Sequence, residues 1–379
     1  MRVNVLGVST TEFGELWEKS PRALARQAIQ GALNDATISS NQIDALFVGN
    51  MLSGILGNQA NLGSFFAEEL GVPVPSYRLE AACASGGVAL NAAINSILAG
   101  QYETVLVLGI EKMTDSSQDD VTSGLMAAGS DEERMAGVTF PGIYALMAQA
   151  YIDEFAVSEE TLATISVKNH YHGSLNDKAQ FRKTITVEDV MESGKIADPL
   201  KLLDCSPISD GASAVIISAK KKGKKPVYIT ASEVASDTLS LHDRSSFTSI
   251  SSVVRASKKA YKKAGIKPEE IDIAEIHDCF SIAEAIAVED LGFSKKGQGA
   301  KDIAEGKMTL GKGKVITNPS GGLKACGHPV GATGIKQIVE ITQQLRGETD
   351  SRQVKNAKIG LTHNVGGSGA IAAIHILRN

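Results

Sequence analysis

Residues 28–44 read AIQGALNDATISSNQID and residues 256–272 read ASKKAYKKAGIKPEEID, so that a constant offset aligns three alanines, an isoleucine and the closing Ile-Asp pair. In both copies alanine recurs at every fourth position, which is typical of a tightly packed helix face. Each copy then enters a short apolar run, 45–49 in the first and 273–277 in the second, which is predicted to be a strand. The chain therefore contains an internal repeat in which a helix is followed by a strand.

The repeat extends to two turns of small residues. The turn ACASGG at residues 82–87 carries Cys83 and precedes an apolar helix that ends near Gly100, followed by a strand over 104–109. In the second half, CGHPVGATG at residues 326–334 carries His328 and precedes a helix expected over 335–345 and a strand over 357–361. Strands that alternate with helices indicate an α/β fold with right-handed crossovers. Two related halves would bring equivalent helix starts together, so Cys83 and His328 are predicted to meet at a common centre.

A long excursion divides the first half. The regular pattern breaks after residue 113, and two helices are expected near 143–155 and 159–172 before the chain returns to a strand at 214–218. We expect an N-terminal half at 1–113, an inserted domain at 114–195, a return segment at 196–222 and a C-terminal half at 223–379. The insertion is either a lid that holds a cofactor or a surface elaboration, and the pattern alone leaves both open.

The composition is that of a globular protein of a reducing compartment. With 43% hydrophobic and 21% charged residues, the 379-residue chain can bury a large core. Its net charge of −5 argues against electrostatic binding of nucleic acid. No apolar run approaches the roughly 18 residues needed to cross a bilayer, and the N-terminus lacks the pattern of a signal peptide. The four cysteines are too scattered for a disulfide framework, so we expect free thiols and a cytoplasmic location.

Residues able to move protons follow several of the predicted strands. They are Cys83, the segment His277-Asp278-Cys279-Phe280, His328, and the pair His363-Asn364 with the glycines that follow it. In open α/β sheets, ligand sites form at the carboxyl ends of strands, so these residues are candidates for a single site. Each also has a purely structural interpretation, such as a helix N-cap for Asp278.

Cys83 is predicted to begin a helix, where unpaired N–H groups and the positive end of the helix dipole favour the thiolate. A buried, inert cysteine is the alternative. A metal site built from Cys326, His328, Cys279 and His363 is also conceivable. However, no closely spaced pair of ligands supports that site, so no bound metal is expected.

Four motifs in order closely resemble the thiolase superfamily over nearly the whole chain. They are the turn around Cys83, the segment at residues 277–280, Gly327-His328-Pro329, and the glycine-rich run at 364–369. The segments at 277–280 and 363–364 resemble the branch with the archaeal and sterol-carrier-protein-type enzymes. The resemblance implies duplicated βαβ halves that form a layered α-β-α-β-α core, with an inserted loop domain on the coenzyme A side.

The resemblance also implies an acetyl-CoA C-acetyltransferase activity, with coenzyme A thioesters as substrates and no permanently bound cofactor. Cys83 would attack a thioester carbonyl after His328 takes its proton, and the backbone amides of Cys83 and Gly366 would stabilise the oxyanion. His277 or His328 would hold the oxygen of the second thioester. Ser206 matches a serine that contacts the pantetheine arm in this family.

This sequence departs from the common thiolase pattern at two positions. That pattern has Asn-Glu-Ala-Phe where this chain has residues 277–280, and it has a catalytic cysteine where Asn364 stands. The acid/base thiol is therefore missing from its usual place. Cys279 is the expected substitute as acceptor of the α-proton, and His363 is the fallback.

For partners, the resemblance implies a homodimer or tetramer that feeds mevalonate synthesis. It also implies possible association with hydroxymethylglutaryl-CoA synthase through a small OB-fold protein, and no nucleic-acid or membrane partner is expected. Two other functions stay open: a ketoacyl-synthase-like condensing enzyme on the same fold, and a non-catalytic acyl-CoA or lipid-binding scaffold. Cleavage of acetoacetyl-CoA by free coenzyme A distinguishes a thiolase from both.

Overall fold

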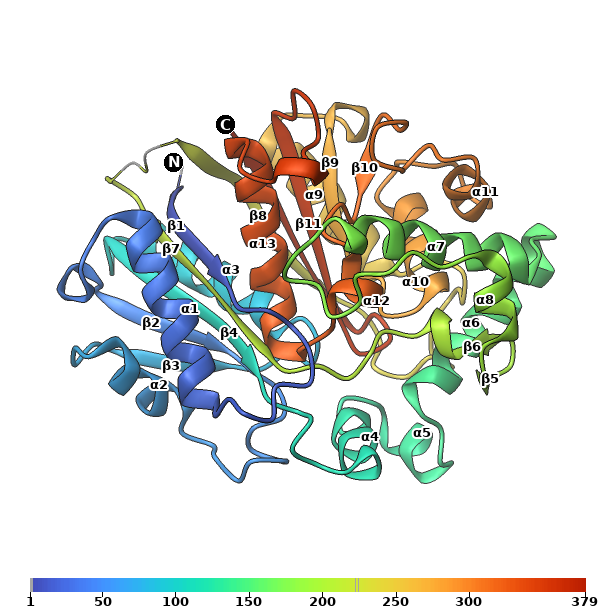
Figure 1. Cartoon of the computed structure of the whole chain (residues 1–379), viewed down its shortest axis with the longest axis horizontal. Coiled ribbons are helices and arrows are strands. Elements are labelled where there is room, and N and C mark those ends of the chain that lie inside the picture. Colours follow the sequence, from blue (N-terminus) through green and yellow to red (C-terminus); the bar gives the residue numbers. More distant parts are fainter. Residues whose placement is uncertain (1–2, 222, 224) are drawn as a thin grey trace.

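The computed structural model describes residues 3–221, 223 and 225–379, and ten strands form its framework (Figure 1). These strands are β1 (Val3–Thr10), β2 (Ala45–Gly49), β3 (Ser76–Leu79), β4 (Thr104–Glu111), β7 (Gly211–Ser218), β8 (Val227–Ser236), β9 (Ile273–Ile276), β10 (Ile316–Thr317), β11 (Ile359–Gly366) and β12 (Ile371–Arg378). All ten belong to one hydrogen-bonded sheet.

The sheet shows the internal repeat directly. Its strand order is β10-β9-β11-β12-β8-β1-β7-β4-β2-β3, so each half contributes five strands, and the two sets are mirror-ordered about the β8–β1 junction. In the first half β2 pairs in parallel with β3 and β4, while β7 runs antiparallel to β4 and β1. In the second half β9 pairs in parallel with β10 and β11, while β12 runs antiparallel to β11 and β8. The duplication predicted from the sequence is therefore confirmed.

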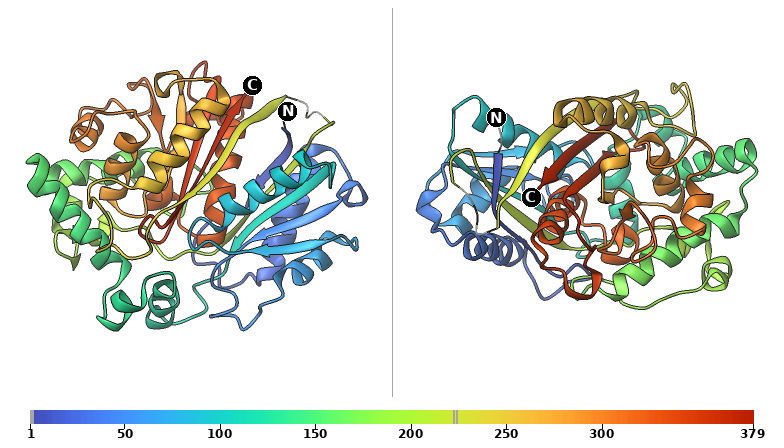
Figure 2. Two further views of the ribbon diagram at one scale, coloured as in Figure 1. Left: turned by 180° about the vertical axis from the view of Figure 1, so that it is seen from behind. Right: turned by 90° about the horizontal axis from the view of Figure 1, so that it is seen from above.

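Helices complete a five-layered arrangement. The repeated helices α1 (Pro21–Ala36) and α9 (Ser251–Ala264) cover the outer faces, α1 against β1 and β7, and α9 against β8 and β12. Between the two halves lie α3 (Ser85–Leu98) and α13 (Val330–Arg346), and each of them contacts strands of both halves. Figures 1 and 2 show α13 between the blue half and the orange-red half, with α9 behind the latter. The predicted α-β-α-β-α layering is confirmed.

The alanine repeat is buried as its spacing predicts. Ala28 and Ala32 of α1, and Ala256 and Ala260 of α9, are each 0% exposed. Small side chains let the helix backbone approach the sheet, because a Cβ added at Gly7 of β1 would overlap the backbone of Ala32. Each helix then leads through a short 3₁₀ turn, η1 (Ser40–Gln42) or η3 (Pro268–Glu270), into the next strand, β2 or β9.

The chain between β4 and β7 forms the insertion. It contains α4 (Gln118–Met126), α5 (Asp131–Met135), α6 (Phe140–Phe155), α7 (Glu159–Ser174), α8 (Val187–Glu192), β5 (Lys195–Ala197), β6 (Leu200–Lys201) and η2 (Leu202–Asp204). The helices expected near 143–155 and 159–172 are α6 and α7. The domain limits themselves stay predictions, and residue 222, the expected end of the return segment, lies outside the described residues.

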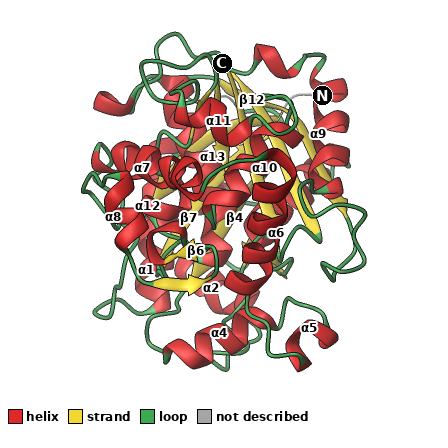
Figure 3. Ribbon diagram, turned by 90° about the vertical axis from the view of Figure 1, so that its right-hand side faces the viewer, coloured by secondary structure: helices red, strands yellow, loops and turns green. Residues whose placement is uncertain are grey.

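Although it leaves from the first half, the insertion packs on the second. Helices α6 and α7 contact α10 (Ser281–Asp290), and α7 also contacts α11 (Gly299–Ala304) and α12 (Gly322–Cys326) (Figure 3). At its base, the Asp210 carboxylate accepts the N–H groups of Met113 and Thr114 at 2.7 and 2.9 Å. This contact closes the insertion where it leaves and rejoins the first half.

The remaining helices are α2 (Leu62–Leu70) and η4 (Asp350–Arg352).

Two elements differ from their predicted limits in a way that affects the candidate site. Strand β11 continues to Gly366 instead of ending at Leu361, because it pairs with β12 as far as Gly366 opposite Ile371. His363 and Asn364 therefore lie within a strand and not in a turn. Helix α13 begins at Val330, five residues before the predicted start.

Glycines let α3 and α13 cross at their N-terminal ends. A Cβ at Gly86 would lie 2.7 Å from the carbonyl oxygen of Gly331, and a Cβ at Gly331 would lie 2.6 Å from the carbonyl oxygens of Gly49 and Ile110. These distances are well inside van der Waals contact, so no larger residue fits without moving a backbone. The crossing brings the start of one central helix directly against the start of the other.

Substitution Gly331→Ala is expected to destabilise the fold by about 1–3 kcal/mol, because overpacking of this size forces backbone shifts. The free energy of unfolding from denaturant titration measures the loss. Gly194→Ala is the matched control, since a Cβ there meets no atom within 4 Å. Equal stability of the two variants would contradict the importance of the crossing.

Candidate active site

Cys83 is held in a tight turn directly before α3. The Ser85 hydroxyl donates to the carbonyl oxygen of Ala82 at 2.6 Å and accepts the N–H of Ala81 at 2.9 Å. Ala82 adopts a left-handed φ of 50°, which costs a non-glycine residue on the order of 1 kcal/mol. Strain at the residue before a nucleophile is typical of turns that point the nucleophile into a cleft.

The predicted meeting of Cys83 and His328 is found in the structure, and His277 joins them. The Cys83 sulfur and one ring nitrogen from each histidine all lie within 4.8 Å of one another. The two imidazole rings stand nearly perpendicular, at 84°, with centroids 5.1 Å apart. His277 follows β9 and His328 precedes α13, so the second half supplies both rings to the cysteine of the first half.

Hydrogen bonds fix the tautomer of His328. Its Nδ1 lies 2.7 Å from the Thr333 hydroxyl, and that hydroxyl donates its only proton to the carbonyl oxygen of Pro329 at 3.1 Å. With the hydroxyl proton directed to Pro329, Nδ1 carries the ring proton and Nε2 has a free lone pair. Burial lowers the pKa of His328 to about 3, so the ring is neutral at pH 7 and can act as a base.

Asn364 fixes the tautomer of His277 in the opposite sense. Its Oδ1 accepts the N–H of Gly87 at 3.1 Å, which leaves Nδ2 to donate to the carbonyl oxygen of Cys83 at 2.9 Å and to His277 Nδ1 at 3.3 Å. His277 Nδ1 is thus an acceptor, so Nε2 carries the proton. Burial, then His328 and His363, lower the pKa of His277 well below its usual value. His277 Nε2–H is consequently a buried, neutral donor, and it has no partner among the described residues.

The expected stabilisation of the Cys83 thiolate is wrong for the free protein. Helix α3 begins at Ser85, two residues after the cysteine. The Cys83 residue is half-buried, and desolvation of its sulfur by the surrounding protein raises the pKa of Cys83 to about 12. The backbone N–H groups of Gly367 and of Cys83 itself lower this pKa, but Glu111 raises it further. The thiol is therefore protonated at neutral pH, because desolvation outweighs the helix terminus. A base is required to activate it.

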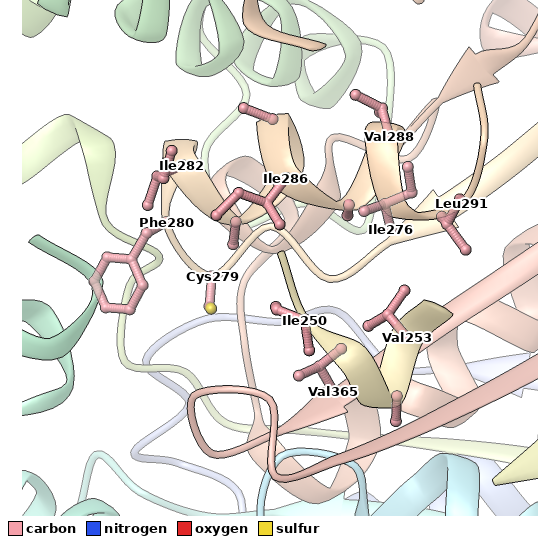
Figure 4. Close-up of a cluster of buried hydrophobic side chains, with 14 of the residues drawn as sticks. Ile250, Val253, Ile276, Cys279, Phe280, Ile282, Ile286, Val288, Leu291 and Val365 are labelled. Atoms are coloured by element: carbon pink, nitrogen blue, oxygen red, sulfur yellow. The ribbon is translucent and has the colours of Figure 1, made fainter. Parts of the chain in front are cut away.

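Cys279 lies in the same region, between the apolar side chains of Phe280, Ile250 and Val365 (Figure 4). Burial and the neighbouring Cys83 raise the pKa of its thiol, whereas a hydrogen-bonding contact with the Tyr144 hydroxyl lowers it. Its backbone carbonyl accepts the N–H of Ser206 at 2.9 Å. Ser206, the predicted pantetheine contact, is thus fixed beside Cys279 through its backbone.

The other predicted residues surround this cluster. His363 is buried, its Nδ1 accepts the backbone N–H of His277 at 3.2 Å, and burial lowers its pKa to about 3. Gly366 ends β11 so close to the backbone of Ala81 that a Cβ there would overlap it. Asp278 does cap a helix, but the helix is α12, since its carboxylate accepts the N–H of Leu323 at 2.6 Å.

Sequence reasoning missed several residues that organise the site. Asn364 is placed near the site from sequence, but its role in bridging both halves is not predicted. Thr333 lies within the motif around His328 but carries no sequence signal of its own. Glu111 is fully buried and accepts the N–H of Gly331 at 3.1 Å, which ties the start of α13 to the end of β4.

Among the described residues, the side chains that could converge on a metal ion are Cys83, His277 and His328, and not the set containing Cys326. Cys326 lies elsewhere, 3.7 Å from the Asn176 amide. The donor set fits a thiol nucleophile with one base and one N–H donor better than a metal site.

Comparison with known proteins agrees with this fold and cluster. The family model described as the thiolase N-terminal domain matches residues 3–221, and that described as thiolase C-terminal domain-like matches residues 233–379. The chain therefore belongs to the thiolase family.

Particular relatives are similar over nearly the whole of this chain. The chain is 49% identical to the acetyl-CoA acetyltransferase of Methanothermobacter thermautotrophicus, over 99% of this chain and 98% of the relative. It is 45% identical to the acetyl-CoA acetyltransferase of Methanocaldococcus jannaschii, with the same coverage. Bovine sterol carrier protein 2 is 34% identical over 98% of this chain and 71% of the relative.

Solved structures share the fold at lower identity. The Ltp2-ChsH2(DUF35) aldolase superposes with a TM-score of 0.85 at 22% identity, covering 99% of this chain and 97% of that one. The Acat5 thiolase of Ascaris suum, determined in complex with coenzyme A, gives 0.75 at 17% identity and covers all of both chains. The described part of this chain contains no helix that is both long and apolar enough to span a bilayer.

The raised pKa of Cys83 predicts its reactivity. Because the pKa is about 12, the thiolate fraction should grow about tenfold per pH unit from pH 7 to 10 without reaching a plateau. Alkylation of Cys83 by iodoacetamide, followed by peptide mass spectrometry at each pH, measures this slope. Free cysteine is the control, since its rate should level off above about pH 8.5. A plateau for Cys83 near neutral pH would show instead a preformed thiolate.

Proposed function

We propose that this protein is an acetyl-CoA C-acetyltransferase, an acetoacetyl-CoA thiolase that joins two acetyl-CoA molecules or runs the reverse cleavage. The observation that carries the proposal is the cluster of Cys83, His328 and His277, with one thiol, one free imidazole lone pair and one unpartnered N–H. The 49% and 45% identity to two archaeal acetyl-CoA acetyltransferases supports the same activity.

The first half-reaction uses Cys83 and His328. His328 Nε2 takes the thiol proton as the sulfur attacks the thioester carbonyl, and coenzyme A leaves with that proton to give acetyl-Cys83. Activation at the moment of attack is required, since burial keeps Cys83 protonated at rest. The proposed donors to the oxyanion are the backbone N–H groups of Cys83 and Gly366. The N–H of Gly367, which acts on the Cys83 sulfur, is a third proposed donor.

The second half-reaction forms the carbon–carbon bond. The Cys279 thiol first passes its proton to His328 Nε2, and the resulting thiolate removes an α-proton from a second acetyl-CoA. The enolate then attacks acetyl-Cys83, and the released Cys83 sulfur takes the proton back from His328. His277 Nε2–H is suited to hold the enolate oxygen, because it is a neutral donor without a partner among the described residues. Loss of one such donor typically costs on the order of 10²–10³ in rate.

Coenzyme A thioesters are the proposed substrates, with the pantetheine arm passing Ser206 beside the insertion. The solved Ascaris suum thiolase with coenzyme A supports this substrate class. We further propose a cytoplasmic homodimer or tetramer that feeds mevalonate synthesis and can join hydroxymethylglutaryl-CoA synthase through a small OB-fold protein.

The decisive experiment separates acylation from cleavage. Incubation with acetyl-CoA should add one acetyl group to Cys83, detected by peptide mass spectrometry, and free coenzyme A should cleave acetoacetyl-CoA. Cys83→Ala should abolish both. Acylation without cleavage would instead indicate a ketoacyl-synthase-like enzyme, and neither reaction would indicate a binding scaffold.

The same assay assigns the second acid/base. Cys279→Ala should still acetylate Cys83 but lose at least about 10²-fold in condensation, since general acid–base catalysis contributes 10²–10⁴. His363→Asn tests the fallback. If His363→Asn loses condensation and Cys279→Ala does not, His363 is the base.

Thr333→Val should slow acetylation of Cys83 about tenfold, because His328 loses the partner that holds its proton on Nδ1. Thr333→Ser keeps the hydroxyl and serves as the control. The rate of acetyl-Cys83 formation, followed by mass at short times, is the measurement. Equal rates for Val and Ser would exclude a role for this hydrogen bond.

A further inference from the structure

The insertion delivers a buried hydroxyl group to the acid/base cysteine. Tyr144 lies on α6 and is 1% exposed, and it is among the largest fully buried side chains of the described residues. Its ring packs on Phe280, with centroids 4.6 Å apart at 30°. Phe280 directly follows Cys279, so this packing places the Tyr144 hydroxyl at the turn that carries the thiol.

The Tyr144 hydroxyl has two acceptors within reach. It donates to the carbonyl oxygen of Gly367 at 3.2 Å, and the Cys279 thiol is the neighbouring side chain toward which it can turn. Burial, followed by the nearby Cys279, raises the pKa of Tyr144 well above its usual value. The phenol therefore keeps its proton and acts as a donor.

Few other groups can stabilise a Cys279 thiolate. Cys83 and Asp278 are the neighbouring groups that raise the pKa of Cys279, and Lys324 is the neighbouring cation that lowers it. The Lys324 ammonium is already hydrogen-bonded to the carbonyl oxygen of Asp204. On the side of Tyr144, the ionisable groups that shift the pKa of its hydroxyl are Cys279, Cys83 and Arg244, and the Arg244 guanidinium is bonded to Ser368.

A hydroxyl proton with two acceptors responds to the charge of the thiol. While Cys279 is protonated, the proton of Tyr144 points to the Gly367 carbonyl. When Cys279 is a thiolate, it becomes the stronger acceptor, because hydrogen bonds to ionised groups are roughly twice as strong as neutral ones. The hydroxyl thus favours the thiolate without transferring its own proton.

We propose that Tyr144 is a positioning residue for the condensation step, which orients the Cys279 sulfur and stabilises its thiolate. In that step the α-carbon–hydrogen bond of acetyl-CoA breaks, an S–H bond forms on Cys279, and the electron pair remains as the enolate. The inference rests on the proposed role of Cys279, and it gives the insertion a part in the chemistry in addition to substrate binding.

The variant Tyr144→Phe removes the hydroxyl and keeps the ring on Phe280. Deuterium uptake into the methyl group of acetyl-CoA in D₂O reports α-proton removal, and mass spectrometry measures it across pH. We expect uptake to fall about 10- to 100-fold at pH 7, as for loss of one charge-assisted hydrogen bond, and its pH dependence to move upward by about one to two units. Acetylation of Cys83 should stay within about threefold of wild type.

Tyr151→Phe is the matched control. Tyr151 lies on the same helix and is also buried, but its hydroxyl bonds to Glu289, away from Cys279. Its uptake profile should match wild type. Unfolding midpoints of both variants verify that they fold. Site-specific incorporation of 3-fluorotyrosine at position 144 is a second test that keeps the side chain in place. Its phenol is more acidic, so the pH dependence of deuterium uptake should move downward.

The outcomes separate the two proposals. If Cys279→Ala keeps deuterium uptake, the assignment of Cys279 as base is wrong. If Cys279→Ala loses uptake while Tyr144→Phe and 3-fluorotyrosine both follow the wild-type profile, the role of Tyr144 alone is wrong. An equal loss of uptake and of Cys83 acetylation in Tyr144→Phe, without a shift in pH dependence, would reduce Tyr144 to a packing residue.

Discussion

The close approach of α3 and α13 is the constraint on which the rest of the structure depends. Because glycines stand at Gly86 and Gly331, the two helix starts cross almost backbone to backbone. A Cβ at Gly334 would overlap the Asn364 amide. Glycine at this position therefore leaves room for Asn364, the residue that links the two halves. Without this crossing, the thiol of one half and the imidazoles of the other would not lie within 4.8 Å of one another.

The site works through neutral groups whose protons are assigned by their partners. Thr333 and Asn364 give His328 and His277 opposite tautomers, so two chemically identical rings become an acceptor and a donor. Burial keeps both rings uncharged and keeps Cys83 protonated. Negative charge therefore develops only during the reaction, on the thioester oxygens that His277 Nε2–H and the backbone N–H groups near Cys83 are proposed to stabilise.

Much of the fold could be predicted from the sequence, because the repeat at 28–44 and 256–272 imposes the same helix and strand order twice. The proximity of Cys83 and His328 followed from that symmetry. The ionisation state of Cys83 could not be predicted, since it depends on how deeply the sulfur is buried. The end of β11 was placed too early because its continuation depends on pairing with β12, and Tyr144 gave no signal because its neighbour Cys279 is distant in the chain.

The continuous pairing of β1 with β8 joins two versions of one unit. In a symmetric dimer of half-length chains, equivalent positions would have to carry the same residue, either a thiol on both sides or an imidazole on both. Joining the units in one polypeptide frees the positions of Cys83 and His328 to diverge. The fused chain can thus place a nucleophile opposite its own base, which identical subunits related by a two-fold axis could not do.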